Sequence, residues 1–466
     1  MLTLNFQNVM SDTVSERDGI TQEELNIGLK NFASRYNNLL ADKNNKKFAF
    51  TELPYQEGVA KDIISFAQES IGTFKNFVHI GIGGSVLGAK AIHTALSHPL
   101  YNQIASKERN YWPKVYFLDN VDPDETYSLL EFLDPQNTLF HIVSKSGETT
   151  ETLATFLIIL KRLKDICGDK FKRNIVITTD ATKGFLRSVA NSEGIRTFSI
   201  PEGVGGRFSA LSAVGLLTAA FSGIDISVLL SGAREMDKIV SRENPAENPA
   251  FIAAFINYTL DTKKGKHILV TMPYAYALKD IADWFRQLWA ESLGKKDSLD
   301  GSVINCGQTP ISALGVTDQH SQIQLYNEGP NDKIVSFIEV EKFRCEVNIP
   351  SLFEGKESVE FLHGKKLSEL MRAEKLGTEA ALVKNNRPNY TITLPDISPA
   401  TVGGFLYFLE MQTLFAGALY DVNPFDQPGV DAGKEASYVI MGRKGYSEKQ
   451  KGLSNFLNQS KKYIIR

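Results

Sequence analysis

Short apolar runs alternate with longer stretches of helical periodicity along most of this chain. Each run has a centre rich in Val, Ile or Phe, which is typical of buried parallel strands. Five runs come first and three follow, at 76–83, 114–120, 138–146, 173–180, 195–201, 266–274, 333–340 and 389–395. This alternation predicts an α/β fold with two mostly parallel sheets, each flanked by helices.

The segment "SRENPAENPAF" at 241–251 separates the two series of runs. Asn248 followed by Pro249 is a typical helix start, so the segment is interpreted as a junction between structured parts. We expect a helical lead-in over 1–49, a first domain over 50–225, a second over 226–445 and a charged tail over 446–466.

Composition narrows the class of protein. The 466 residues hold 51 Lys and Arg against 54 Asp and Glu, a net charge of −3 that offers no basic excess for nucleic acid. The sequence has no apolar run of about 20 residues and no signal-peptide pattern. Cys167, Cys306 and Cys345 lie too far apart for a metal knuckle, and three cysteines predict no disulfide framework. We therefore expect a cytoplasmic metabolic enzyme without a membrane partner.

A glycine turn follows the first predicted strand, in "HIGIGGSVLGAK" at 79–90. Gly83 and Gly84 let the backbone approach a ligand, and Ser85 adds a hydroxyl. Val86 stands where a dinucleotide fingerprint needs glycine, and Leu87 stands where a nucleophile elbow needs it. The turn is thus a candidate binding loop, or a tight turn without a ligand.

The stretch "SKSGETTET" at 144–152 places hydroxyls where a strand gives way to a helix. Backbone N–H groups and the positive end of a helix favour an anion there. Lys145 is the one cation in the stretch, which suits a single phosphate. Helix capping by Ser and Thr is the alternative interpretation.

Several further residues have side chains suited to catalysis. Arg207 follows a glycine turn and is placed to stabilise an oxyanion, or to form a structural salt bridge. Glu291 lies near the end of an amphipathic helix, where apolar neighbours would suit a general base, but periodicity alone favours the alternative of a solvated carboxylate. His320 and Gln427 lie in polar turns, Lys434 follows the second turn into a predicted helix, and none of the three carries much weight singly.

Taken together, these segments resemble the motifs of the glucose-6-phosphate isomerase family, of bacterial type. The motifs are "IGIGGSVLGAKAI", "SKSGETTET", "VGGRFSALSAVG", "ESLGKK", "DQHSQ" and "YDVNPFDQPGVDAGK", in that order, within residues 50–445. The resemblance implies two flavodoxin-like sugar-isomerase (SIS) domains that interconvert glucose 6-phosphate and fructose 6-phosphate, an aldose–ketose step of glycolysis and gluconeogenesis. It also implies no metal or other cofactor.

The resemblance implies a role for each matching residue. Glu291 would be the base, Arg207 would face the enediolate, and His320 with Lys434 would open the sugar ring. The substrate-binding residues would be Gly83, Gly84, Ser85, Ser144, Lys145, Ser146, Thr149, Thr152 and Gln427. In the family the histidine comes from the partner subunit, which implies a homodimer with shared active sites.

Two alternatives to this function stay open at this stage. One is a dual phosphoglucose and phosphomannose isomerase, because tolerance of the C2 epimer depends on pocket shape. The other is a sugar-phosphate sensor that has lost catalysis. Asp431 also departs from the family pattern, because its last signature usually has glutamate there.

Overall fold

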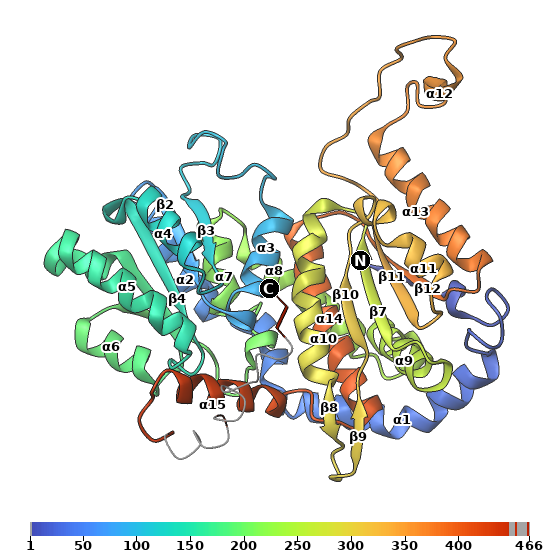
Figure 1. The fold of residues 1–466 in the computed structure, drawn as a ribbon, viewed down its shortest axis with the longest axis horizontal. Helices are drawn as coiled ribbons and strands as arrows, with labels where there is room; N and C mark the ends of the chain where they lie inside the picture. The colour runs from blue at the N-terminus through green and yellow to red at the C-terminus, as the bar shows by residue number, and fades with distance from the viewer. Residues whose placement is uncertain (1, 447–452, 454–463, 466) are drawn as a thin grey trace.

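Two five-stranded sheets lie on either side of a central group of helices in the computed structural model (Figure 1). The structure describes residues 2–446, 453, 464 and 465. The predicted tail over 446–466 therefore lies almost wholly outside the described residues. The predicted α/β class with two mostly parallel sheets is confirmed.

The first sheet is wholly parallel and has the strand order β3-β2-β4-β5-β6. Its strands are β2 (Asn76–Ile80), β3 (Lys114–Leu118), β4 (Thr138–Val143), β5 (Ile175–Thr179) and β6 (Arg196–Ser199). Numbered along the chain, the order is 2-1-3-4-5, as in flavodoxin-like folds. It reverses between β2 and β4, so the loops after these two strands border one crevice.

Helices cover both faces of the first sheet. Side chains on one face pack against α4 (Pro123–Phe132), α5 (Thr150–Cys167) and α6 (Phe185–Glu193). Those on the other face join a core with α2 (Glu57–Glu69), α3 (Leu87–Leu96) and α7 (Ala213–Phe221). All six residues of β4 are buried, which explains why its sequence is mostly apolar, with Thr138 and His141 as its two polar residues.

The second sheet contains four parallel strands and one antiparallel edge strand, in the order β1-β12-β11-β7-β10. The strands are β1 (Thr3–Asn5), β7 (Ile268–Pro273), β10 (Thr309–Ser312), β11 (Lys333–Val340) and β12 (Asn389–Leu394). The apolar pattern missed β1 and β10. Both are short edge strands, and Pro310 is tolerated at an edge because one side of the strand needs no ladder partner.

The N-terminal lead-in is therefore not only helical. It contains the predicted helix as α1 (Gln22–Asn44), but it also contributes β1 to the second sheet. The junction near 248 is confirmed as a helix start, because the Asn248 side chain accepts hydrogen bonds from the backbone of Ala250 and Phe251 at the start of α9 (Pro249–Lys264).

The central helices pack unusually closely. A Cβ atom on Gly232 of α8 (Ile226–Val240) would lie 1.8 Å from the carbonyl oxygen of Ala400 in α14 (Pro399–Tyr420). A Cβ on Gly403 of α14 would lie 1.9 Å from the carbonyl oxygen of Leu229. Helix α14 is long and apolar enough to cross a membrane, yet its apolar window is 94% buried within the protein. It is the core helix between the two sheets.

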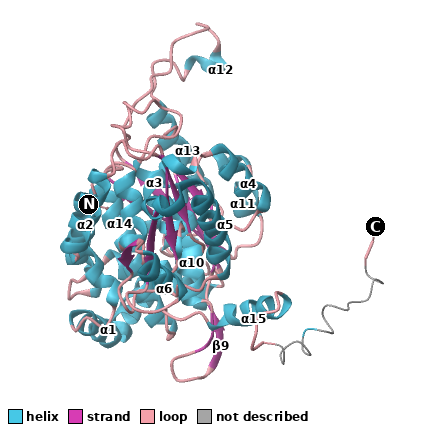
Figure 2. Cartoon of the chain, turned by 90° about the vertical axis from the view of Figure 1, so that its left-hand side faces the viewer, coloured by secondary structure: helices cyan, strands magenta, loops and turns pink. Residues whose placement is uncertain are grey.

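Three segments extend from this body. The segment 341–366 carries α12 (Glu357–Glu360) and leads into α13 (Leu367–Lys384), and it projects from the second sheet (Figure 2). The hairpin of β8 (Lys295–Asp297) and β9 (Val303–Cys306) follows α10 (Lys279–Leu293). Helix α15 (Asp431–Ile440) lies below the first sheet in the view of Figure 1. The three cysteines are unpaired.

Candidate active site

The loop after β4 forms a compact group of hydroxyls at the start of α5. The Ser144 and Thr149 hydroxyls are 2.8 Å apart, and Ser146 Oγ accepts a hydrogen bond from the backbone of Glu148 at 3.1 Å. Thr149 is the N-terminal cap residue, but its side chain makes no capping bond. Thr152 is buried and its hydroxyl has no partner. Capping therefore does not account for these hydroxyls.

Lys145 connects this loop electrostatically with Arg207. Burial lowers the pKa of the Lys145 ammonium, Asp180 opposes that change, and the positive charge of Arg207 lowers the pKa further. Lys145 and Arg207 are thus close enough for their charges to interact, and a nearby anion would stabilise both.

The glycine turn after β2 is the 3-10 turn η3 (Gly83–Ser85), and it packs against the loop that carries Arg207. A Cβ on Gly84 would lie 2.2 Å from the carbonyl carbon of Gly206, so only glycine allows this approach. Gly83 has φ 57°, and a Cβ there would lie 2.9 Å from Gln287 Nε2. The turn therefore touches both Arg207's loop and helix α10.

Arg207 is 3% exposed, and each of its five N–H groups is used. They donate to Ser292 Oγ at 2.8 Å, Gln427 Oε1 at 2.9 Å, Glu291 Oε2 at 3.3 Å, and the carbonyls of Pro424 at 2.6 Å and Asp426 at 2.9 Å. Burial lowers the pKa of the guanidinium, and Glu291 and Asp426 oppose the change. This network fixes the guanidinium plane beside the Glu291 carboxylate.

Glu291 lies in the last turn of α10, as the sequence predicts. Its carboxylate accepts from Arg207 and, at 3.1 Å, from Gln287 Nε2. Trp284 and Leu288 are buried, but the Glu291 side chain is 33% exposed. The apolar surroundings expected for the carboxylate are therefore wrong: the helix buries its apolar side and presents Glu291 at the edge, to polar partners and to solvent.

Lys295 is a site residue that the sequence reasoning missed. Its ammonium donates to the carbonyl oxygens of Glu291 at 2.6 Å and Asp426 at 2.8 Å. Burial and the nearby Arg207 lower its pKa, and Asp426 opposes them. Lys295 thus ties the end of α10 to the segment that carries Gln427. Its position four residues after Glu291 is the signal that the sequence offers.

His320 and Lys434 are not brought to this cluster within one chain. His320 ends the 3-10 turn η9 (Thr317–His320) of the second sheet and is exposed. Lys434 lies in α15 as expected, is 56% exposed, and is 4.0 Å from Asp431 Oδ1. Among the described residues no hydrogen bond or ion pair joins either side chain to Arg207 or Glu291.

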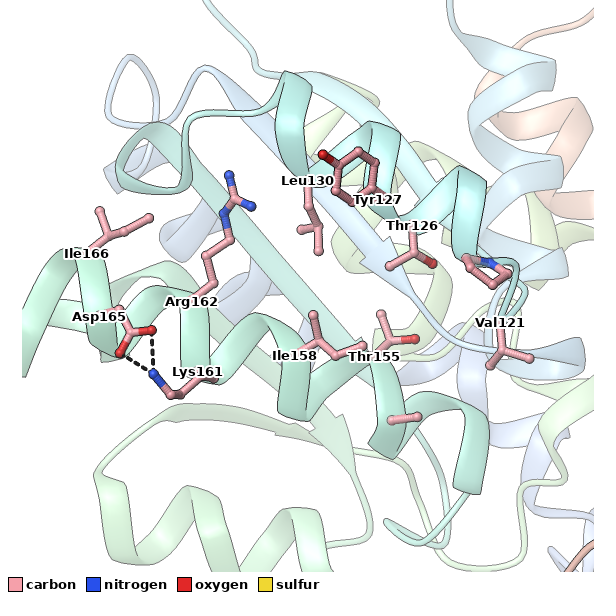
Figure 3. Close-up of a pocket in the computed structure, with 12 residues that line it drawn as sticks. Val121, Thr126, Tyr127, Leu130, Thr155, Ile158, Lys161, Arg162, Asp165 and Ile166 are labelled. Carbon is pink, nitrogen blue, oxygen red and sulfur yellow. Dashed lines mark hydrogen bonds and ion pairs between the residues drawn. The ribbon is translucent and has the colours of Figure 1, made fainter. Parts of the chain in front are cut away.

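A separate apolar pocket of about 740 Å³ lies between α4 and α5 (Figure 3). Tyr127, Leu130 and Ile158 face it, and the Lys161–Asp165 ion pair lies at one end. None of the predicted site residues lines it. Within the described residues no group of three or more His, Cys, Asp or Glu side chains is placed to hold a metal ion.

The fold and the crevice define an α/β protein of the sugar-isomerase class, with a hydroxyl-rich loop at the topological switch point of its first sheet and an Arg–Glu pair beside the glycine turn. Comparison with known proteins gives the particular family. Residues 63–460 match the family model described as phosphoglucose isomerase. The chain therefore belongs to the phosphoglucose isomerase family, which confirms the predicted family and fold.

Relatives and solved structures agree with this assignment. A glucose-6-phosphate isomerase of Carboxydothermus hydrogenoformans is 46% identical over 451 residues, which is 96% of each chain. One from Methanocaldococcus jannaschii is 38% identical over 95% of this chain and 100% of its own. The crystal structure of a hypothetical protein from Thermus thermophilus has a TM-score of 0.79 at 35% identity, covering 95% of this chain and all of the other.

Proposed function

We propose that this chain interconverts D-glucose 6-phosphate and D-fructose 6-phosphate by ring opening and proton transfer through an enediolate. The observation that carries the proposal is the Arg207–Glu291 pair, which borders the crevice shared by the hydroxyl loop and the glycine turn. A base beside a fixed cation is what abstraction of a proton next to a carbonyl requires.

The loop after β4 is proposed to bind the 6-phosphate. Its donors would be the hydroxyls of Ser144, Ser146, Thr149 and Thr152 with Lys145, and the turn of Gly83, Gly84 and Ser85 would close the other side. The unpartnered Thr152 hydroxyl and the uncapped start of α5 support this role. Hydroxyl donors and one ammonium match a phosphate monoester.

Glu291 is proposed to move the proton between C1 and C2, and Arg207 to stabilise the enediolate oxygens. Since every N–H of Arg207 already has an acceptor, direct donation to substrate requires one acceptor to leave. Gln427 is exposed, whereas the carbonyls of Pro424 and Asp426 are fixed in the backbone. We infer that substrate replaces the Gln427 amide on Arg207.

His320 and Lys434 are proposed to open the sugar ring once both side chains are brought to the crevice. Both ends of helix α15 are held close to the site. Before the helix, Gln427 contacts Arg207. After it, Arg443 is 4.0 Å from Glu148 of the loop after β4. Lys434 on that helix is therefore near the crevice. The exposure of His320 suits delivery from a second subunit, so we propose a homodimer with shared sites, located in the cytoplasm.

Coupled assays with fructose 6-phosphate and mannose 6-phosphate, each with EDTA present, test this function. Isomerase activity on the first substrate alone is expected. Activity on both would indicate the dual enzyme. Binding of fructose 6-phosphate without turnover would indicate the sensor and contradict the proposal.

A further inference from the structure

His79 is a buried histidine of β2 that lies next to the candidate site but outside it. It is 0% exposed and pairs in register with His141 of β4, with ring centroids 4.7 Å apart. Both rings face the side of the sheet that α7 covers, as the bond from His79 to Thr218 shows. The two histidines are thus alike in burial and position, and they differ in what their nitrogens hold.

Both nitrogens of His79 have partners. Nε2 is 2.7 Å from the carbonyl oxygen of Ser85, and Nδ1 is 2.7 Å from Thr218 Oγ1. Because a carbonyl oxygen only accepts, Nε2 carries the hydrogen, and the neutral ring accepts from the Thr218 hydroxyl through Nδ1. Burial lowers the pKa of His79 to about 4, so the ring is neutral at physiological pH.

The Ser85 carbonyl lies in the glycine turn of the candidate site. A Cβ on Gly81 would lie 2.7 Å from this oxygen, so the chain folds back tightly over the end of β2. The same turn packs on Gly206 beside Arg207, and Gly83 packs on Gln287, which donates to Glu291. A displacement of Ser85 would therefore reach both members of the Arg207–Glu291 pair.

We propose that His79 is a positioning residue for the isomerase reaction: its Nε2–H holds the Ser85 carbonyl and thereby sets the turn 83–85 against Arg207 and Gln287. The inference rests on the proposed function. Without this donor the carbonyl would be a partly buried acceptor without its protein partner, and the turn would shift to find another.

His141 supplies a matched control. Its Nε2 is 2.7 Å from Thr178 Oγ1, its Nδ1 is buried without a partner, and Thr178 belongs to β5 rather than to a site loop. A histidine that only fills the core should behave as His141 does. A positioning histidine should respond to which of its nitrogens is replaced.

The test compares His79→Gln, His79→Asn and the same two changes at His141. The Gln amide can place its nitrogen near the position of Nε2 and donate to Ser85, whereas Asn reaches only the position of Nδ1. We expect His79→Asn to lower kcat/KM for fructose 6-phosphate about 10²-fold, mainly through kcat, because small misplacements at a catalytic centre have effects of that size. His79→Gln should stay within a few-fold of wild type.

Thermal midpoints and inhibition by inorganic phosphate are measured for all four variants. Inhibition should change much less than kcat, because the hydroxyl and ammonium donors of the loop after β4 remain intact and only the turn on the other side of the site shifts. Equal activity losses in the two His79 variants, or losses that follow stability as in the His141 variants, would overturn the proposal. If the wild type has no isomerase activity, the proposed function fails instead. In that case the affinity for fructose 6-phosphate, measured by calorimetry, replaces kcat/KM in the comparison of the variants. The His79→Asn variant should then bind this sugar more weakly than the His79→Gln variant.

Discussion

The two sheets share the order of their first four parallel strands but differ in what their loops carry. Each has a first strand, β2 or β7, at the point where the order reverses. In the first sheet the loops there hold a glycine turn and a group of hydroxyl and ammonium side chains. In the second, the loop after β7 presents exposed Tyr276, and the segment after β11 projects from the body (Figure 1). A shared topology provides the position of a site, and the loop chemistry decides whether one is there.

The second sheet still supplies half of the candidate site. Glu291 and Lys295 come from α10 and its end, and Gln427 comes from the segment after α14. The site thus lies between a half on the first sheet, which holds the binding loops and Arg207, and a half attached to the second, which holds the proposed base. Substitutions in one half or the other can separate their contributions.

Replacing the proposed base should have the largest effect. Glu291→Gln keeps the shape and the Arg207 contact but removes the basic oxygen, so turnover should fall at least about 10²–10⁴-fold. Affinity should change little, because the phosphate loop is untouched. Deuterium incorporation from solvent at C2, followed by NMR, should be lost in parallel.

Glu235→Gln is a suitable control, because Glu235 is an exposed carboxylate of α8 that pairs with Lys238. It should leave turnover unchanged. If the Glu291→Gln enzyme exchanges the C2 proton at nearly the wild-type rate, Glu291 is not the base.

Weakening the binding half comes next. Ser146→Ala combined with Thr149→Ala should raise the dissociation constant for 6-phosphate sugars at least about 10²-fold, since hydrogen bonds to charged groups contribute roughly 1.5–3 kcal/mol each. Turnover at saturation should fall much less. Tyr276→Ala, in the loop after β7 at the point where the strand order of the second sheet reverses, should leave affinity unchanged. Calorimetry measures both, and a loss of turnover at constant affinity would argue against the phosphate role.

The sequence predicted the parts of this site that are local. A strand followed by hydroxyls and an apolar helix specifies its own geometry, so the loop 144–152 and all five strands of the first sheet were found. The contacts between residues that lie far apart along the chain could not be predicted in this way. Arg207 meets Ser292 and Gln427 only because the two sheets pack together, and no periodicity shows such a contact. The exposure of the Glu291 carboxylate depends on the same packing.

Acid should destabilise the first sheet before the second. His79 is fully buried and has a pKa of about 4, against about 6.5 in an unfolded chain, and burial also lowers the pKa of His141. Between these values the unfolded state binds more protons, so the free energy of unfolding falls as pH falls from about 6.5 toward 4. The loss from His79 alone should be roughly 3 kcal/mol.

Denaturant unfolding at about pH 7 and about pH 4.5 measures this loss, and His79→Gln should reduce it because glutamine does not titrate. Hydrogen exchange locates the change. Amides of β2 and β4 should lose protection before those of β7 and β11. Simultaneous loss in both sheets would show that the buried histidines do not set the acid response.

The smallest effect is expected when two variant chains are combined in one dimer. This experiment tests whether His320 of one subunit completes the site that contains Glu291 of the other. Each site would combine Glu291 of one chain with His320 of its partner, so His320→Ala and Glu291→Gln homodimers should both be inactive. In a mixed dimer one site receives both defects and the other receives none. A purified heterodimer should therefore recover up to half of the wild-type turnover, with an unchanged KM.

Differently tagged chains, isolated by two affinity steps, give this heterodimer. A heterodimer that stays inactive would show that each site is built from a single chain, and Lys434 and His320 would then have to reach the crevice by movement within that chain.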